Sequence, residues 1–264
     1  MTTDSFIVEL IWYVVTFMYG IVIGSFLNVC ILRIPAGESI AKERSHCMTC
    51  GYQLKWYDLI PLFSYLFLGG KCRKCKSHIS LQYPLVEALN GVLYVLIFLV
   101  NGWSIDSVIY CLLTSALIVI SVIDFRTYEI PNGINWFILA LGLIHLFLHL
   151  GDWVEYVIGL VGVSTFIWIV MEVTDRMPIG CAIGGGDARL MRAAGFLIGW
   201  KLSILAFFFG CCFGSVIHPI RMVVSKQGHE LAFGPYLAAG ILTAALWGNQ
   251  FLGWYLGLFT APVG

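Results

Sequence analysis

The chain has 264 residues, of which 59% are hydrophobic and only 11% are charged, and its formal net charge is zero. Soluble globular domains contain about 45–50% apolar and about 25% charged residues, so this composition excludes an ordinary soluble domain and indicates a membrane protein. A chain without net charge has no overall field that attracts nucleic acid. The lipid bilayer is therefore an expected partner, and nucleic acid is not.

Eight apolar runs are long enough, or nearly so, to cross a bilayer, which requires about 20 mostly apolar residues. The run at 186–200 is the weakest, because it is short, rich in glycine and carries Arg189 and Arg192. The first run exceeds the core of a signal peptide and has no basic residues before it, so we expect a retained span. The sequence thus predicts an all-α polytopic membrane protein with about eight transmembrane helices at 6–32, 84–101, 106–123, 134–150, 154–173, 186–200, 202–222 and 236–259.

The basic residues predict how these spans are oriented. With eight spans, 14 of the 15 Lys and Arg residues lie in one set of loops and their flanks, at 33–83, 124–133, 174–192 and 221–235. Loops rich in Lys and Arg stay on the cytoplasmic side of a membrane. We therefore expect these loops in the cytoplasm and both termini outside.

The polar segment 35–82 contains two Cys-x-x-Cys pairs, Cys47 with Cys50 and Cys72 with Cys75, separated by 21 residues. Four thiolates at this spacing can close tetrahedrally on Zn²⁺, and a reducing cytoplasm disfavours disulfides. A closed four-cysteine site is structural rather than catalytic. Four ordinary thiols or a redox pair are the alternatives. Four basic residues flank the second pair and would favour thiolates: Lys71, Arg73, Lys74 and Lys76.

Two histidines, His145 and His149, lie four residues apart at the outer end of the fourth run. This spacing allows both side chains to form one edge of a metal site on a helix. Anchoring at the membrane interface is the preferred interpretation, because amphipathic side chains gather there.

Two aspartates carry the main functional prediction. Asp124 follows the apolar run Ser107–Ile123, and Asp187 follows three glycines. With eight spans, both lie at the cytoplasmic ends of their helices. Ionisable groups at membrane spans are costly and usually functional, and two converging carboxylates are sufficient for acid–base peptide hydrolysis. The pairing is a hypothesis at this stage; its alternatives are helix capping by Asp187 and a solvated loop position for Asp124.

These residues resemble the type IV prepilin peptidases over nearly the whole chain. Asp124 with Ile130-Pro131 is similar to the family's first catalytic segment, and Gly184–Asp187 to its Gly-x-Gly-Asp signature. The sequence departs from the family at Arg189, where a lysine is expected. The other matching segments are Gly24–Cys30 with Arg33–Pro35, Asp58–Leu66, Ile79–Glu87 and Phe233–Tyr236.

The resemblance implies an aspartic endopeptidase that cleaves the basic leader of type IV prepilins and pseudopilins at the cytoplasmic face of the bacterial plasma (inner) membrane. It implies that Asp124 and Asp187 are the catalytic pair. It also implies methylation of the new N-terminus with S-adenosylmethionine, for which Asn28 and Glu87 are weak candidate site residues. The ligands of the structural Zn²⁺ would be Cys47, Cys50, Cys72 and Cys75.

On this basis the chain divides into three parts: a first span at 1–34, a cytoplasmic zinc-binding domain at 35–83 and a transmembrane aspartyl peptidase domain at 84–264. Two other classes remain open. One is a different intramembrane aspartyl protease, against which the zinc segment and Phe233–Tyr236 argue. The other is a membrane transporter or assembly scaffold that uses the carboxylates as proton sites.

Overall fold

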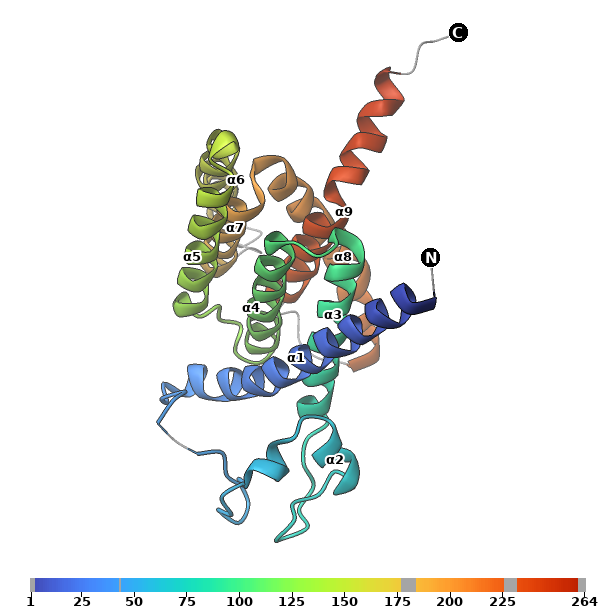
Figure 1. Ribbon diagram of the computed structural model, residues 1–264. Helices are drawn as coiled ribbons and strands as arrows, with labels where there is room; N and C mark the ends of the chain where they lie inside the picture. Colours follow the sequence, from blue (N-terminus) through green and yellow to red (C-terminus); the bar gives the residue numbers. More distant parts are fainter. Residues whose placement is uncertain (1–2, 43, 177–183, 226–231, 261–264) are drawn as a thin grey trace. The chain divides into compact units, whose positions relative to one another are not determined.

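The computed structural model describes residues 3–42, 44–176, 184–225 and 232–260 (Figure 1). In those residues every regular element is helical apart from two isolated antiparallel β-bridges. The chain forms two compact units, Met1–Val119 and Ile120–Gly264, and the division falls within helix α4 (Ile105–Thr127). The expected three-part functional division of the chain stays a prediction.

The first unit is built around the packing of two long helices, α1 (Thr3–Ala36) and α3 (Gln82–Asn101). A Cβ atom on Gly20 would lie 2.6 Å from the Cα atom of Gly91, so the two backbones touch there. Side chains gain little by moving from lipid to a helix interface, and close backbone approach through small residues is the usual substitute. The cysteine segment, residues 37–81, lies between these helices in the chain and includes the short helices η1 (Trp56–Leu59) and α2 (Phe63–Phe67) (Figure 1).

A buried polar chain links α1, α3 and the first part of α4. The amide of Asn90 donates to the carbonyl oxygen of Gly20 at 2.7 Å and accepts from the hydroxyl of Ser115 at 3.0 Å. The hydroxyls of Tyr94 and Ser115 are 2.9 Å apart. Because Asn90 is fully buried and both ends of its amide are hydrogen-bonded, this residue stabilises the packing of the three helices.

The second unit surrounds a short central helix, α7 (Gly185–Ile198), which packs against four other helices. A Cβ atom on Gly159 would lie 2.1 Å from the carbonyl oxygen of Gly195, so α6 and α7 are also in backbone contact. This contact fixes the height and rotation of α7. The neighbours of α7 are α5 (Asn132–Leu148), α6 (Trp153–Asp175), α8 (Trp200–Ser225) and α9 (Gly234–Thr260), and η2 (Leu150–Asp152) joins α5 to α6.

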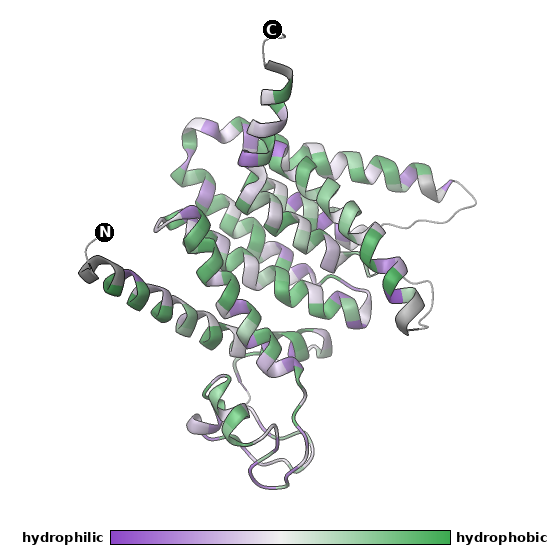
Figure 2. Ribbon diagram, turned by 90° about the vertical axis from the view of Figure 1, so that its right-hand side faces the viewer, coloured by the Kyte–Doolittle hydropathy of each residue, from purple (hydrophilic) through white to green (hydrophobic). Residues whose placement is uncertain are grey.

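Each of the eight apolar runs forms a helix, and apolar residues predominate along these helices (Figure 2). Within the described residues, five helical stretches are long and apolar enough to cross a membrane: Ile7–Ala36, Gln82–Asn101, Ile105–Thr127, Leu150–Val173 and Trp200–Met222. Helix α5 is apolar but has only 17 residues, and α7 has 14. The helices are consistent with a multi-pass membrane protein, whereas the count of eight spans and the orientation stay predictions.

The contact between α6 and α7 makes a testable prediction. We expect Gly159→Ala to destabilise the protein by about 1–3 kcal/mol, because the new methyl group meets backbone that cannot move aside. Gly162→Ala is the matched control one turn further along α6, where the nearest atom to a new Cβ is 3.7 Å away. The stability of each variant is measured by its thermal midpoint in detergent. Equal midpoints for Gly159→Ala and Gly162→Ala would contradict the close packing of α6 on α7.

Candidate active site and metal centre

Asp124 lies in the last turn of α4 and not in a solvated loop. The helix continues to Thr127 and ends where Tyr128 adopts a left-handed conformation with φ of 55°. The N–H of Tyr128 then donates to the carbonyl oxygen of Asp124 at 2.9 Å, as at many helix ends. Since only 5% of Asp124 is exposed, the loop alternative is wrong.

The carboxylate of Asp124 is held by the first residue of α9. The N–H of Gly234 donates to Oδ2 of Asp124 at 2.9 Å. A Cβ atom on residue 234 would lie 2.8 Å from the same oxygen, so this approach requires glycine. The family resemblance marks Phe233–Tyr236 only as a matching segment. Within that segment, Gly234 is the residue that contacts Asp124.

Asp187 is the third residue of α7 and caps that helix. Its Oδ2 accepts from the N–H of Gly184 at 3.0 Å, and its own N–H donates to the carbonyl oxygen of Gly184 at 3.0 Å. The positive end of the helix dipole also favours a carboxylate at this position. Only 6% of Asp187 is exposed. The capping alternative is therefore realised, and it holds the carboxyl group in a fixed place.

The segments that carry the two aspartates pack against each other. A Cβ atom on Gly186 would lie 3.1 Å from Cβ of Ile130, and the guanidinium of Arg189 donates to Oδ1 of Asn132. This bond gives the arginine, which replaces the expected lysine, a defined partner. The two carboxyl groups are therefore carried on adjoining segments, at the end of α4 and the start of α7. Two like-charged, buried groups of this kind are suited to sharing a proton.

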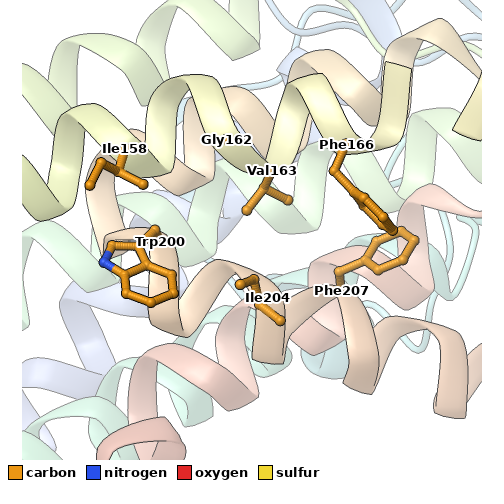
Figure 3. Close-up of a pocket in the computed structure, with 7 residues that line it drawn as sticks. All are labelled: Ile158, Gly162, Val163, Phe166, Trp200, Ile204 and Phe207. Atoms are coloured by element: carbon orange, nitrogen blue, oxygen red, sulfur yellow. The ribbon is translucent and has the colours of Figure 1, made fainter. Parts of the chain in front are cut away.

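A separate cavity of about 290 Å³ lies between α6 and α8 (Figure 3). Its wall is apolar and carries no carboxyl, thiol, imidazole or amino group. Such a cavity suits hydrocarbon and offers no group for acid–base chemistry. Its lining residues are Ile158, Gly162, Val163, Phe166, Trp200, Ile204 and Phe207.

The four cysteines converge, as their spacing predicts. The sulfurs of Cys47, Cys50, Cys72 and Cys75 all lie within 4.8 Å of one another, and those of Cys47 and Cys75 are 3.8 Å apart. Tetrahedral Zn²⁺ with bonds of about 2.3 Å to each sulfur would place the sulfurs about 3.8 Å apart. The cluster therefore fits a metal ion of this size and geometry.

Each Cys-x-x-Cys pair sits in the same kind of tight turn. Cys47 donates its N–H to Tyr52 and accepts from the N–H of Gly51; Cys72 makes the equivalent bonds with Ser77 and Lys76. The residue after each second cysteine has a positive φ, 67° at Gly51 and 59° at Lys76. The two turns are thus structurally equivalent, and glycine supplies the conformation at low cost in only one of them.

Backbone hydrogen bonds lower the pKa values of the Cys47 and Cys50 thiols, whereas burial raises them. The backbone N–H groups of Cys50 and Thr49 lower the pKa of the Cys47 thiol to about 6. The N–H of Tyr52 favours the Cys50 thiolate, but burial and the neighbouring sulfurs raise the pKa of Cys50 to about 11. A cation at the centre of the cluster would reverse the second effect, because it stabilises all four thiolates together.

The two weak candidates for the methyl-donor site are buried and hydrogen-bonded within the first unit. The amide of Asn28 donates to the carbonyl oxygen of Tyr83 at 3.2 Å, and Oε2 of Glu87 accepts from the N–H of Leu62 at 2.8 Å. Leu62 has a φ of 59°, a conformation that a leucine adopts rarely. These contacts give both side chains a structural role, and the geometry assigns neither to S-adenosylmethionine.

The two histidines at the end of α5 stack on each other. The ring centroids of His145 and His149 are 4.5 Å apart, and Tyr156 lies edge-on to His145 at 5.2 Å. His145 is buried, with 4% exposed. Burial and aromatic packing give His145 a place within the protein interior, and the interpretation of the pair as an interfacial anchor stays a prediction.

Comparison with known proteins places the chain in a family. Residues 18–101 match the Bacterial Peptidase A24 N-terminal domain, and residues 111–218 match the Type IV leader peptidase family. The chain belongs to the type IV leader peptidase family. The prediction of an aspartic peptidase of this family is confirmed, and the transporter or scaffold alternative loses its support.

Curated relatives cover almost the whole chain. A prepilin leader peptidase/N-methyltransferase from Bacillus subtilis (strain 168) is 31% identical over 92% of this chain and 97% of its own length. Proteins of the same name from Stutzerimonas stutzeri and Pseudomonas aeruginosa are 33% and 31% identical, over 90% and 91% of this chain and 91% and 92% of their own lengths. No solved structure matches the chain.

Proposed function

We propose that this chain is a prepilin leader peptidase that uses Asp124 and Asp187 to remove the basic leader from type IV prepilins and pseudopilins. The observation that carries the proposal is that α4 and α7 each bury one carboxylate, fixed by a backbone N–H donor, and that the segments carrying the two aspartates pack against each other. Membership of the type IV leader peptidase family supports it. The substrate class comes from the names of the relatives.

The chemistry follows from two carboxyl groups that cannot both ionise cheaply. One keeps its proton while the other is charged. The charged group takes a proton from water, and the resulting hydroxide attacks the scissile carbonyl carbon. The protonated group donates a hydrogen bond to the carbonyl oxygen and later gives its proton to the leaving amine. The pair titrates as a unit, so neither role belongs to one named residue.

Methylation of the freed N-terminus is the second activity. The relatives are named as N-methyltransferases as well as peptidases, and S-adenosylmethionine is the methyl donor that the resemblance implies. The amine must lose its proton before it can accept a methyl group. Because proteolysis needs the carboxyl pair and methyl transfer does not, the two activities should respond differently to changes at Asp124.

The cysteine cluster takes a structural Zn²⁺ in this proposal. Four cysteine ligands leave no open position for substrate or water, so the ion takes no part in hydrolysis.

Within the cysteine segment, the guanidinium of Arg73 is 2.7 Å from the carboxylate of Asp58 and lies over the ring of Tyr57. With the expected topology, the cysteine segment and both aspartates face the cytoplasm of a bacterium, in the plasma (inner) membrane.

The peptidase proposal is tested on a prepilin peptide with its leader, with products identified by mass. We expect Asp124→Asn and Asp187→Asn each to lower the cleavage rate at least 10²-fold, because an amide cannot exchange the proton. Asp152→Asn, at an exposed aspartate in η2, is the control and should cleave normally. Wild-type rates in either variant would remove the residue from the dyad.

The same preparations test the separation of the two activities. With S-adenosylmethionine and a precleaved peptide, Asp124→Asn should retain methylation. Equal loss of cleavage and methylation in this variant would point to one shared site.

The zinc proposal is tested by elemental analysis of purified protein. We expect one zinc per chain, lost when Cys47→Ser is combined with Cys72→Ser, together with a lower thermal midpoint, because metal binding supplies folding free energy. Cys211→Ser, at an exposed cysteine of α8 outside the cluster, should keep the metal. Chelated protein with an unchanged thermal midpoint and protease resistance would show that the cluster does not need a metal.

A further inference from the structure

Asn135, in the first turns of α5, is buried without a hydrogen-bond partner. Only 5% of the residue is exposed, as for Asp124, and neither Oδ1 nor Nδ2 has a partner among the residues that the structure describes. Asn90 is fully buried, yet both ends of its amide are hydrogen-bonded. Leaving both ends of a buried amide unpaired carries a large desolvation cost, so a leucine at position 135 would be the more stable choice.

The register of α5 against α7 places Asn135 beside the start of α7. Asn132 contacts Arg189, and a Cβ atom on Gly142 would lie 2.7 Å from Cδ1 of Phe196, so the two helices run in the same direction. Asn135 lies two turns before Gly142 and therefore on the same face of α5. By this register it stands within about one turn, roughly 5 Å along the helix axis, of Asp187.

The amide of asparagine offers one donor and one acceptor side by side, as a peptide group does. Extended peptide advances about 3.3 Å per residue, so along a substrate that lies parallel to α7 an amide offset from Asp187 by about 5 Å is level with the backbone one or two residues from the scissile bond. Asn135 and Asp187 are both buried, at 5% and 6% exposed.

We propose that Asn135 is a substrate-binding residue of the peptidase, whose amide hydrogen-bonds the substrate backbone next to the scissile bond. The inference rests on the proposed function of Asp124 and Asp187. It accounts for the retention of an unpaired buried amide, since sites built for binding often keep a group that lowers the stability of the free protein.

The experiment compares Asn135→Thr with Asn135→Val, two side chains of nearly the same shape that differ in one hydroxyl group. The hydroxyl can donate and accept a hydrogen bond, whereas the methyl group can do neither. On a prepilin peptide with its leader, we expect kcat/KM for the valine variant to fall at least tenfold and the threonine variant to retain at least five times the valine value. The thermal midpoint of the valine variant should equal or exceed that of wild type.

Asn90→Val is the matched control, because it removes a buried asparagine that is fully hydrogen-bonded. It should lower the thermal midpoint while kcat/KM of the folded protein stays at the wild-type value. Equal kcat/KM for the threonine and valine variants at position 135, or a loss of thermal stability in Asn135→Val like that of Asn90→Val, would overturn the inference. Asp187→Asn in the same assay distinguishes a failure of this inference from a failure of the proposed function. If wild type cleaves and Asp187→Asn does not, a wild-type kcat/KM for Asn135→Val overturns only the role of Asn135.

Discussion

A carboxylate buried beside a bilayer is stable only where the protein replaces the water it has lost. Here the replacement is a backbone N–H at the start of a helix: Gly234 for Asp124 and Gly184 for Asp187. The first bond ties the end of α4 to the start of α9, although 110 residues separate Asp124 from Gly234, and the second is a cap within the start of α7. The bare glycine backbone is what permits the approach at Asp124, because a side chain at position 234 would occupy the space of the carboxylate.

The same dependence on backbone contact runs through the helices. Gly20 meets Gly91 in the first unit, and Gly159 meets Gly195 in the second. Hydropathy predicts the helices well, because a run of apolar residues near a bilayer has few other ways to satisfy its backbone. It says little about which helices touch. The glycines that decide the contacts are scattered among many others in the sequence, and only the structure separates Gly159, in backbone contact, from Gly162, which lines the cavity between α6 and α8.

Part of the candidate site could be predicted from the sequence. The cysteine spacing predicted the cluster, because four thiols in two Cys-x-x-Cys turns have few alternatives. The cause of the low pKa of Cys47 could not be predicted from the sequence. It lies in hydrogen bonds from the backbone N–H groups of Cys50 and Thr49, whose positions are set by the fold of the turn, rather than in the nearby basic residues. The sequence does not indicate a functional role for Asn135, since an asparagine at the start of a helix usually suggests a cap or a turn. Its interest comes from burial without a partner, which is a property of the fold.

We propose that Asp124 and Asp187 share one proton in the active enzyme. The most direct measurement is the pH dependence of kcat/KM on a prepilin peptide. Activity then requires one carboxyl group protonated and the other ionised, so the rate should fall at low pH, where both are protonated, and again at higher pH, where both are ionised. A bell-shaped profile is the predicted result. A rate that rises through a single ionisation to a plateau, with no falling limb, would contradict the shared proton.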